Sequence, residues 1–273
     1  MRSRVEEAER ADVAVTSRPV LPFFVLVVLL SVPLWVLGLF VESPEGTPMD
    51  LPVSALMFAC PFLAAWIMLW RQGSAGEIRH LLRRAVDPRT VRPRTWYFPT
   101  FLTIPVIVAA VDWCLRLTGS ADGERGSIAA LPLLLVLFLV SAVGEETGWM
   151  GYAVEPMRAR WGALVAGLFI GAFWAIWHVL PLVQADRSFV WIAWWFLGTV
   201  ALRVLIVWLY VNAGRSVVVA VIVHAFVNVG MVLLPDYTTH VAPVALFGCL
   251  SALSALVVTV LWGPTLARFR LRS

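Results

Sequence analysis

Two adjacent carboxylates, Glu145 and Glu146, stand within an apolar part of the chain. The apolar run Leu131–Val143 precedes them, and Gly148 and Gly151 after them would let a neighbouring helix approach closely. Neighbours on an α-helix project about 100° apart, so one carboxylate can face a cavity while the other faces a second helix. A carboxylate withdrawn from water holds a proton more readily, which suits a general base. The alternative is a helix end that reaches into cytoplasmic water.

Two histidines and an asparagine are the other polar candidates. His178 stands in an aromatic segment with Trp174 one turn before it, and taken alone it fits a packed, hydrogen-bonded residue better than a catalyst. His224 and Asn228 are spaced i, i+4, so they form one polar stripe on an otherwise apolar helix. Such a stripe can donate two hydrogen bonds to an oxyanion, or bond to a neighbouring helix instead.

Taken together, these side chains place two carboxylates, two imidazoles and a carboxamide in three helices of one bundle. That set fits hydrolysis by a glutamate-activated water, and it equally fits a metal site built from the same side chains. The remaining candidates are assigned structural roles. Asp112 is one turn from Arg116, which predicts an ion pair. Cys60, Cys114 and Cys249 lie in apolar runs and are predicted to be small buried hydrophobic residues.

The composition requires the helices that carry these residues to lie in a membrane. Of 273 residues, 60% are hydrophobic and 14% charged, whereas a soluble domain is about half apolar and a quarter charged. This excludes a soluble globular protein, a disordered chain and a disulfide scaffold, and it predicts an all-α, polytopic membrane helix bundle. The eight apolar segments that are long enough to span lie at about 20–41, 51–70, 95–115, 130–152, 163–183, 189–211, 217–235 and 241–263.

The arginines orient this bundle. All 21 basic side chains other than histidine are arginine, and if the N-terminus is cytoplasmic, 17 of them fall on the cytoplasmic side and three outside. Only Arg203 lies within a span. This positive-inside bias predicts cytoplasmic N- and C-termini in a multi-pass protein of the cell membrane, and it explains the net charge of +4 without nucleic acid as a partner. The absence of lysine and the compact chain favour a bacterial plasma membrane.

The predicted organisation has a single membrane domain between two tails. Residues 1–19 form a cytoplasmic N-terminal tail, residues 20–263 the transmembrane bundle, and residues 264–273 a basic cytoplasmic tail. The segment Gly76–Arg94 is basic with an apolar stripe. It either lies on the inner membrane surface and binds anionic lipid, or is a loop that fixes the topology.

Three motifs follow one another in separate spans: the Glu145-Glu146 pair, an aromatic residue four positions before His178, and His224 four positions before Asn228. Together they resemble the CAAX protease and bacteriocin-processing (CPBP) family of intramembrane proteases, also called the type II CAAX prenyl endopeptidase or abortive-infection family. The resemblance covers about residues 130–230, the predicted protease-like core. The motifs that carry it are the pair Glu145-Glu146, the aromatic-to-histidine spacing from Trp174 to His178, and the spacing from His224 to Asn228.

The resemblance implies a role for each of these positions. Glu145 would be the base that activates water together with His178, and His224 and Asn228 would stabilise the oxyanion. Glu146 would help to order the site. The family is often described as metalloproteases, so a divalent metal such as zinc, held by Glu145, His178 and His224, stays open beside a metal-free, glutamate-activated water.

This chain departs from the family pattern at Met150, which stands where the family has an arginine after the Glu pair. We hypothesise that Arg203, just past the middle of the sixth span, pairs with Glu146 in its place and supports the site together with Trp174. The predicted spans also leave Glu145 and His178 at different depths.

That difference in depth between Glu145 and His178 is roughly 10–15 Å along the bundle. A shift of the fourth span to about 134–156 would remove part of it. Helix tilt or a break near Pro181 would have to remove the rest.

The function expected from the sequence is an integral membrane endopeptidase that cleaves in or near the cytoplasmic half of the bilayer. Its partners would be the lipid bilayer and a membrane-embedded or lipidated peptide, with prenylated C-terminal peptides implied by the resemblance. One alternative is a non-catalytic family member that acts as a membrane-protein scaffold or bacteriocin self-immunity factor. Proton-coupled transport is a third possibility, disfavoured because no inverted repeat is visible.

Overall fold

A computed structural model of the chain describes residues 16–41, 51–73, 75–123 and 125–267, and all regular secondary structure in these residues is helical. The main helices are α2 (Val20–Leu37), η2 (Val53–Ala59) with α3 (Cys60–Arg71), α4 (Ala75–Val86), α5 (Tyr97–Leu117), α6 (Leu131–Gly148), α7 (Val154–Trp161), α8 (Ala163–Gln184), α9 (Phe189–Asn212), α10 (Val217–Leu233) and α11 (Val241–Trp262). Most of both predicted tails, with three arginines in each, lies outside the described residues.

The predicted polytopic helical bundle is confirmed. Seven helical segments of the described residues are long and apolar enough to cross a membrane, and they correspond to seven of the eight predicted spans. The eighth, α10, is an apolar helix of 17 residues and therefore only about 25 Å long. Helices suit such apolar runs because every backbone hydrogen bond is made within the segment.

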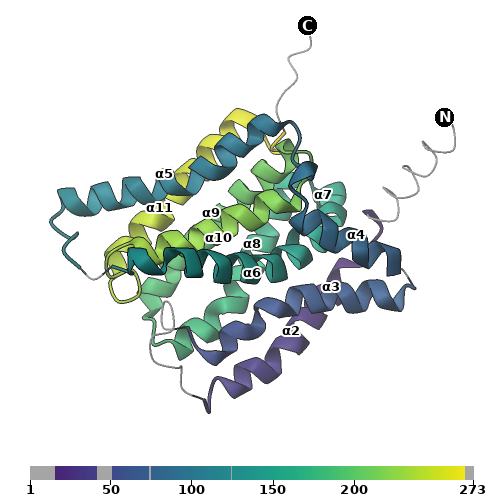
Figure 1. Cartoon of the computed structure of the whole chain (residues 1–273), viewed down its shortest axis with the longest axis horizontal. Coiled ribbons are helices and arrows are strands. Elements are labelled where there is room, and N and C mark those ends of the chain that lie inside the picture. Colours follow the sequence, from purple (N-terminus) through teal and green to yellow (C-terminus); the bar gives the residue numbers. More distant parts are fainter. Residues whose placement is uncertain (1–15, 42–50, 74, 124, 268–273) are drawn as a thin grey trace, which may run out of the picture.

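Helix α9 lies at the centre of the bundle and packs against α8, α10 and α11, while α6 packs against α3 and α10 (Figure 1). The predicted close approach at glycine is present. A Cβ atom on Gly148 would lie 2.6 Å from the backbone of Pro61 in α3, and one on Gly151 would lie 2.7 Å from the Leu81 side chain of α4. The absence of a side chain at these positions lets α3 and α4 lie directly against the helix that carries Glu145.

The fourth predicted span, 130–152, ends too early. Helix α6 continues through a π-helical turn, Trp149–Ala153, into α7, and a single residue, Gly162, separates α7 from α8. Gly162 has φ of 83°, a conformation that glycine adopts without steric cost. The chain reverses direction at Gly162. Glu145 lies 17 residues before Gly162 and His178 lies 16 residues after it, so the two side chains come to the same depth in the bundle. The break expected near Pro181 is absent, because α8 continues to Gln184.

The basic segment after α3 forms helix α4, and part of its apolar stripe packs on the protein. Leu81 and Ala85 are buried against the bundle, whereas Leu82 and Val86 are exposed. The Arg84 guanidinium donates to the hydroxyl of Tyr210 at 2.9 Å. These contacts fix α4 to the same end of the bundle as the end of α9.

The structural roles assigned to the remaining candidates are only partly correct. The predicted Asp112–Arg116 ion pair is present, with Nε of Arg116 2.7 Å from Oδ2 of Asp112. Cys60 is buried, as predicted, but Cys114 is half-buried and Cys249 is exposed. The prediction was wrong for these two because a membrane helix is apolar on its outward face as well, so apolar neighbours do not indicate burial in the bundle.

Candidate active site

A cavity of about 390 Å³ lies between η2, α6, α8, α9 and α10, and we refer to it as the site cavity. Its polar lining includes Glu145, His178, His224 and Asn228, four of the predicted site residues, together with the edge of Trp174. Glu146 does not line it. The divergence of neighbouring helical side chains expected from the sequence is therefore present, with one carboxylate toward the cavity and the other toward adjacent helices.

Glu145 is held in the cavity wall by two indole groups. Its Oε2 accepts hydrogen bonds from Nε1 of Trp174 at 2.6 Å and from Nε1 of Trp149 at 3.3 Å. No residue in the described part of the chain forms a hydrogen bond or ion pair with Oε1. The carboxylate is 5% exposed, which excludes the alternative of a helix end in cytoplasmic water. One oxygen is thus fixed, and the other is available to a water or a substrate.

Glu146 joins three helices through a buried network of charges. Its Oε2 lies 2.7 Å from Nη1 of Arg203 in α9, and its Oε1 lies 2.8 Å from Nδ1 of His224 in α10. Glu146 and Arg203 are both fully buried. The ion pair hypothesised from the sequence is therefore present in the structure, where Arg203 approaches from another helix and Met150 is packed in the core.

The hydrogen bonds to the two histidines define which ring nitrogen faces the cavity. Nδ1 of His178 lies 2.9 Å from the carbonyl oxygen of Trp174, and Nδ1 of His224 faces the Glu146 carboxylate. Both partners are acceptors, so each Nδ1 carries the hydrogen. In the neutral ring this leaves the lone pair on Nε2, and a protonated ring would donate from Nε2. Each imidazole thus has one atom free for chemistry.

Trp174 contacts four of the site residues, namely Glu145, Arg203, His178 and His224. Besides its bond to Glu145, its ring lies 4.4 Å from Cζ of Arg203, a cation–π contact. Its ring centroid is 5.5 Å from that of His178 and 5.0 Å from that of His224. This one side chain therefore fixes the relative positions of the cavity carboxylate, the buried arginine and both imidazoles.

Residues 127–230 match a family model described as type II CAAX prenyl endopeptidase Rce1-like. The resemblance predicted from the three motifs is confirmed. A similar curated protein is CAAX prenyl protease 2 of Methanococcus maripaludis, which is 24% identical over 219 residues, covering 74% of this chain and 79% of that protein. Residues 127–230, the Rce1-like segment, include Glu145, His178, His224 and Asn228, whereas Tyr237 and Thr238 of the cavity lining lie outside it.

The side chains of the Rce1-like segment do not fit the predicted metal set. No three His, Cys, Asp or Glu residues in the described part of the chain are grouped closely enough to hold an ion. Oε1 of Glu145 and Nε2 of each imidazole are available as ligand atoms, but their side chains are not grouped closely enough to hold an ion. A zinc site in a hydrolase usually has three protein ligands that converge on the ion. Glu145, His178 and His224 line one cavity without converging in this way.

Two donors in the Rce1-like segment have roles that sequence analysis missed. Trp174 was expected to support the site but not to donate a hydrogen bond to Glu145, and Trp149 was not among the predicted site residues. A signal was present for Trp149, because it stands four residues after Glu145, the spacing at which helical side chains meet. Without the side-chain orientations, that spacing could not distinguish a hydrogen-bond donor from a packing residue.

Proposed function

We propose that this chain is an integral membrane endopeptidase that hydrolyses a peptide bond of a membrane-associated, CAAX-type substrate. The observation that carries the proposal is a buried carboxylate, Glu145, fixed at one oxygen in a cavity that it shares with His178, His224 and Asn228. The match to CAAX prenyl endopeptidases supports the same reaction class. We place the protein in a bacterial plasma membrane, on the basis of its arginine-only basic composition.

In the proposed reaction, Glu145 and His178 bind one water between them. Glu145 takes a proton as the water oxygen attacks the peptide carbonyl carbon, which forms a tetrahedral intermediate with a negative oxygen. Asn228 and a protonated His224 donate hydrogen bonds to that oxygen. Glu145 then gives that proton to the amide nitrogen as the carbonyl re-forms and the C–N bond breaks, which releases an amine and a carboxylic acid that ionises in water.

The second carboxylate has a different role because its surroundings differ. Glu146 accepts the Nδ1–H of His224, which orients the ring so that Nε2 is turned away from Glu146 and can serve the oxyanion. Arg203 balances the charge of Glu146, so this carboxylate stays ionised and is a poor proton acceptor. Glu146 is therefore a positioning residue, and Glu145 is the base.

The rest of the site cavity suits an apolar substrate. Its walls include Phe138, Leu182, Trp191, Trp195 and Met231. A substrate with a prenyl group or an apolar membrane segment could leave its anchor in lipid or against these walls while its peptide backbone reaches Glu145. We therefore propose a lipidated or membrane-embedded peptide as the substrate.

The test is a cleavage assay in detergent with a quenched farnesylated peptide and product analysis by mass spectrometry, with and without a chelator. We expect cleavage at one peptide bond that the chelator does not reduce, because the side chains do not assemble a three-ligand site. Inhibition by the chelator with recovery on adding zinc would instead establish a metalloprotease. If the folded protein cleaves nothing and Glu145→Ala still supports its cellular role, the protein is a scaffold or self-immunity factor.

Substitution Trp174→Phe should lower kcat by about tenfold or more with little change in KM. The change removes one hydrogen bond to a charged group, which contributes about 1.5–3 kcal/mol. The matched control is Trp177→Phe in the same helix, because Trp177 also donates a buried indole N–H, but to Ser31 at 2.8 Å. Equal losses in both variants would show that Trp174 acts only through packing.

A further inference from the structure

The site cavity occupies only one half of the bundle. Its lining comes from residues 51–58 in η2 and just before it, residues 137–145 of α6, residues 174–185 at the end of α8, Arg187, residues 191–202 of α9, residues 224–231 of α10, and residues 237–238. These are the parts of the helices that lie toward the end where α2, α8 and α10 finish and α6, α9 and α11 begin. We call this the cavity end of the bundle.

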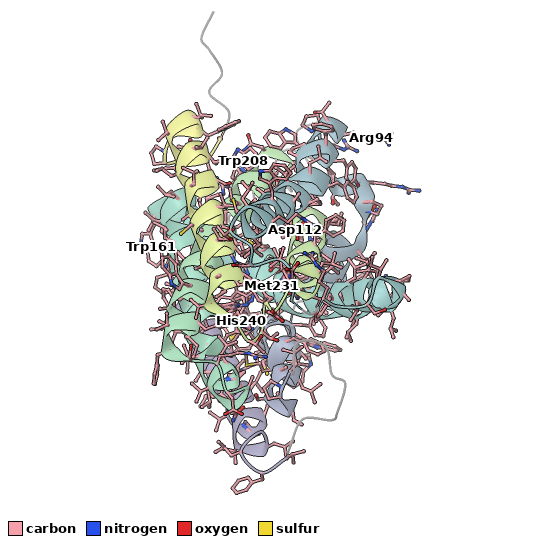
Figure 2. All side chains as sticks on the ribbon, turned by 90° about the vertical axis from the view of Figure 1, so that its left-hand side faces the viewer. Arg94, Asp112, Trp161, Trp208, Met231 and His240 are labelled. Atoms are coloured by element: carbon pink, nitrogen blue, oxygen red, sulfur yellow. The ribbon has the colours of Figure 1, made fainter. Side chains whose placement is uncertain are left out.

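The arginines gather at the opposite end, where α3, α7 and α9 finish and α5, α8 and α10 begin. The described arginines of this arginine end are Arg18, Arg71, Arg79, Arg83, Arg84, Arg89, Arg92, Arg94, Arg158, Arg160 and Arg215. At the cavity end the described residues include only Arg116, Arg125 and Arg187. In Figure 1, α4 and α7 of the arginine end lie at the right and the loop between α10 and α11 lies at the left, and Figure 2 looks onto this left-hand side, where Met231 and His240 are labelled.

A layer of fully buried side chains separates the site cavity from the arginine end. Trp149, Met150 and Tyr152 of the π-helical turn are 0% exposed, as is Arg203 beside them. Beyond this layer, Glu155 accepts a hydrogen bond from Tyr210, which itself accepts one from Arg84. In the described part of the chain, no cavity-lining residue comes from this side of the layer.

The opposite part of the site cavity reaches the surface. Leu56 of η2 is 54% exposed and Leu137 of α6 is 44% exposed, and both line the cavity. Arg187 and Thr238, also in the lining, are partly exposed at the loops of the cavity end. An apolar segment could therefore enter between η2 and α6, on the lipid-facing side, while its peptide extends toward Glu145.

Arginine-rich ends of membrane proteins stay in the cytoplasm, so the cavity end faces the other side of the membrane. From this we infer that the site takes a substrate anchored in the outer leaflet, with its scissile bond presented from the non-cytoplasmic side. The inference rests on the proposed endopeptidase function and narrows its substrate class. It differs from the sequence-based expectation of cleavage in the cytoplasmic half, because the cavity lining comes from the end of the bundle opposite the arginines.

Peptide cleavage by sealed right-side-out vesicles and by sealed inverted vesicles tests the inference. The probe is a quenched farnesylated peptide with a sulfonated dye that does not cross membranes. Right-side-out vesicles should cleave added peptide, whereas sealed inverted vesicles should show less than about a tenth of that rate until detergent opens them. Cleavage by sealed inverted vesicles alone would overturn the inference. Absence of cleavage even in detergent would contradict the proposed function instead, and the labelling described next would still decide the orientation.

Cysteine labelling in intact cells tests the orientation independently of activity. The chain used has Cys114 and Cys249 replaced by alanine, and Cys60 is retained because it is buried. Ser120→Cys at the exposed cavity end should react with a membrane-impermeant maleimide in intact cells. Arg83→Cys, whose native side chain is 72% exposed at the arginine end, should react only after permeabilisation. The reverse pattern would overturn the inference.

Discussion

Replacing Glu145 by glutamine should lower kcat for peptide cleavage by about 10²–10⁴-fold while leaving the helical bundle folded. Glutamine has nearly the same shape, and its amide oxygen can still accept the hydrogen bonds that Trp174 and Trp149 donate. It cannot take up the proton that a hydrolytic water must lose. The measurement is single-turnover cleavage in detergent, with the thermal unfolding temperature of each purified protein recorded in parallel.

The control for Glu145→Gln is Asp112→Asn, which neutralises a carboxylate that does not line the site cavity. Asp112 pairs with Arg116 and Arg125 at the cavity end of α5, each at 2.7 Å, and both pairs are partly exposed. Such pairs contribute at most about 1 kcal/mol, so activity should be close to that of the unaltered chain. Full activity in Glu145→Gln would show that another group is the base, and the proposed mechanism would be wrong.

Replacing Arg203 by leucine should cause the largest loss of stability of any single change considered. The guanidinium is fully buried, 2.7 Å from the equally buried Glu146. Removing one partner of such a pair leaves an uncompensated charge and costs about 3–5 kcal/mol. We expect a lower unfolding temperature, lower yield and loss of cleavage, because Glu146 would also hold His224 less well. Thermal unfolding in detergent and the cleavage assay measure these effects.

The double variant Arg203→Leu with Glu146→Gln separates charge from packing. It removes the carboxylate that Arg203→Leu leaves without a partner, so most of the lost stability should return. Comparing the unaltered chain, both single variants and the double variant then gives the coupling energy between residues 146 and 203. Cleavage should stay low, since His224 no longer has a carboxylate partner. An Arg203→Leu protein with unchanged stability and activity would contradict the idea that Arg203 replaces the family arginine.

The hydropathy of the sequence was sufficient to predict the helices, because each span in lipid must satisfy its own backbone. The end of the fourth span was predicted wrongly because Glu155, Arg158 and Arg160 have the composition of a loop. In the structure the Glu155 carboxylate forms an ion pair within its own helix and accepts a hydrogen bond from α9. Arg158 lies 2.8 Å from its carboxylate, and Tyr210 donates to it at 3.0 Å.

The site residues followed from motif spacing and from the cost of placing charge in a membrane. Arg203 could be paired with Glu146 because it is the single ionisable residue of its span. The two indole donors to Glu145 could not be predicted, since a tryptophan in an apolar helix is usually a packing residue and its N–H direction depends on the rotamer. The exposure of Cys249 could not be predicted from its apolar neighbours either, because residues that face lipid and residues in the protein core are of the same apolar types.

The brevity of α10 bears on how water reaches the reaction. A helix of about 25 Å is shorter than the roughly 30 Å hydrocarbon layer, so the chain after Leu233 returns as irregular backbone below the membrane surface. Such backbone is stable in a bilayer only where protein or solvent satisfies it. Here Trp191 donates to the carbonyl of Tyr237 at 2.8 Å and Arg187 donates to that of Thr238, both beside the site cavity. Because Arg187 and Thr238 line the cavity and are partly exposed, water can reach the cavity beside this segment while a lipid-held substrate stays in place.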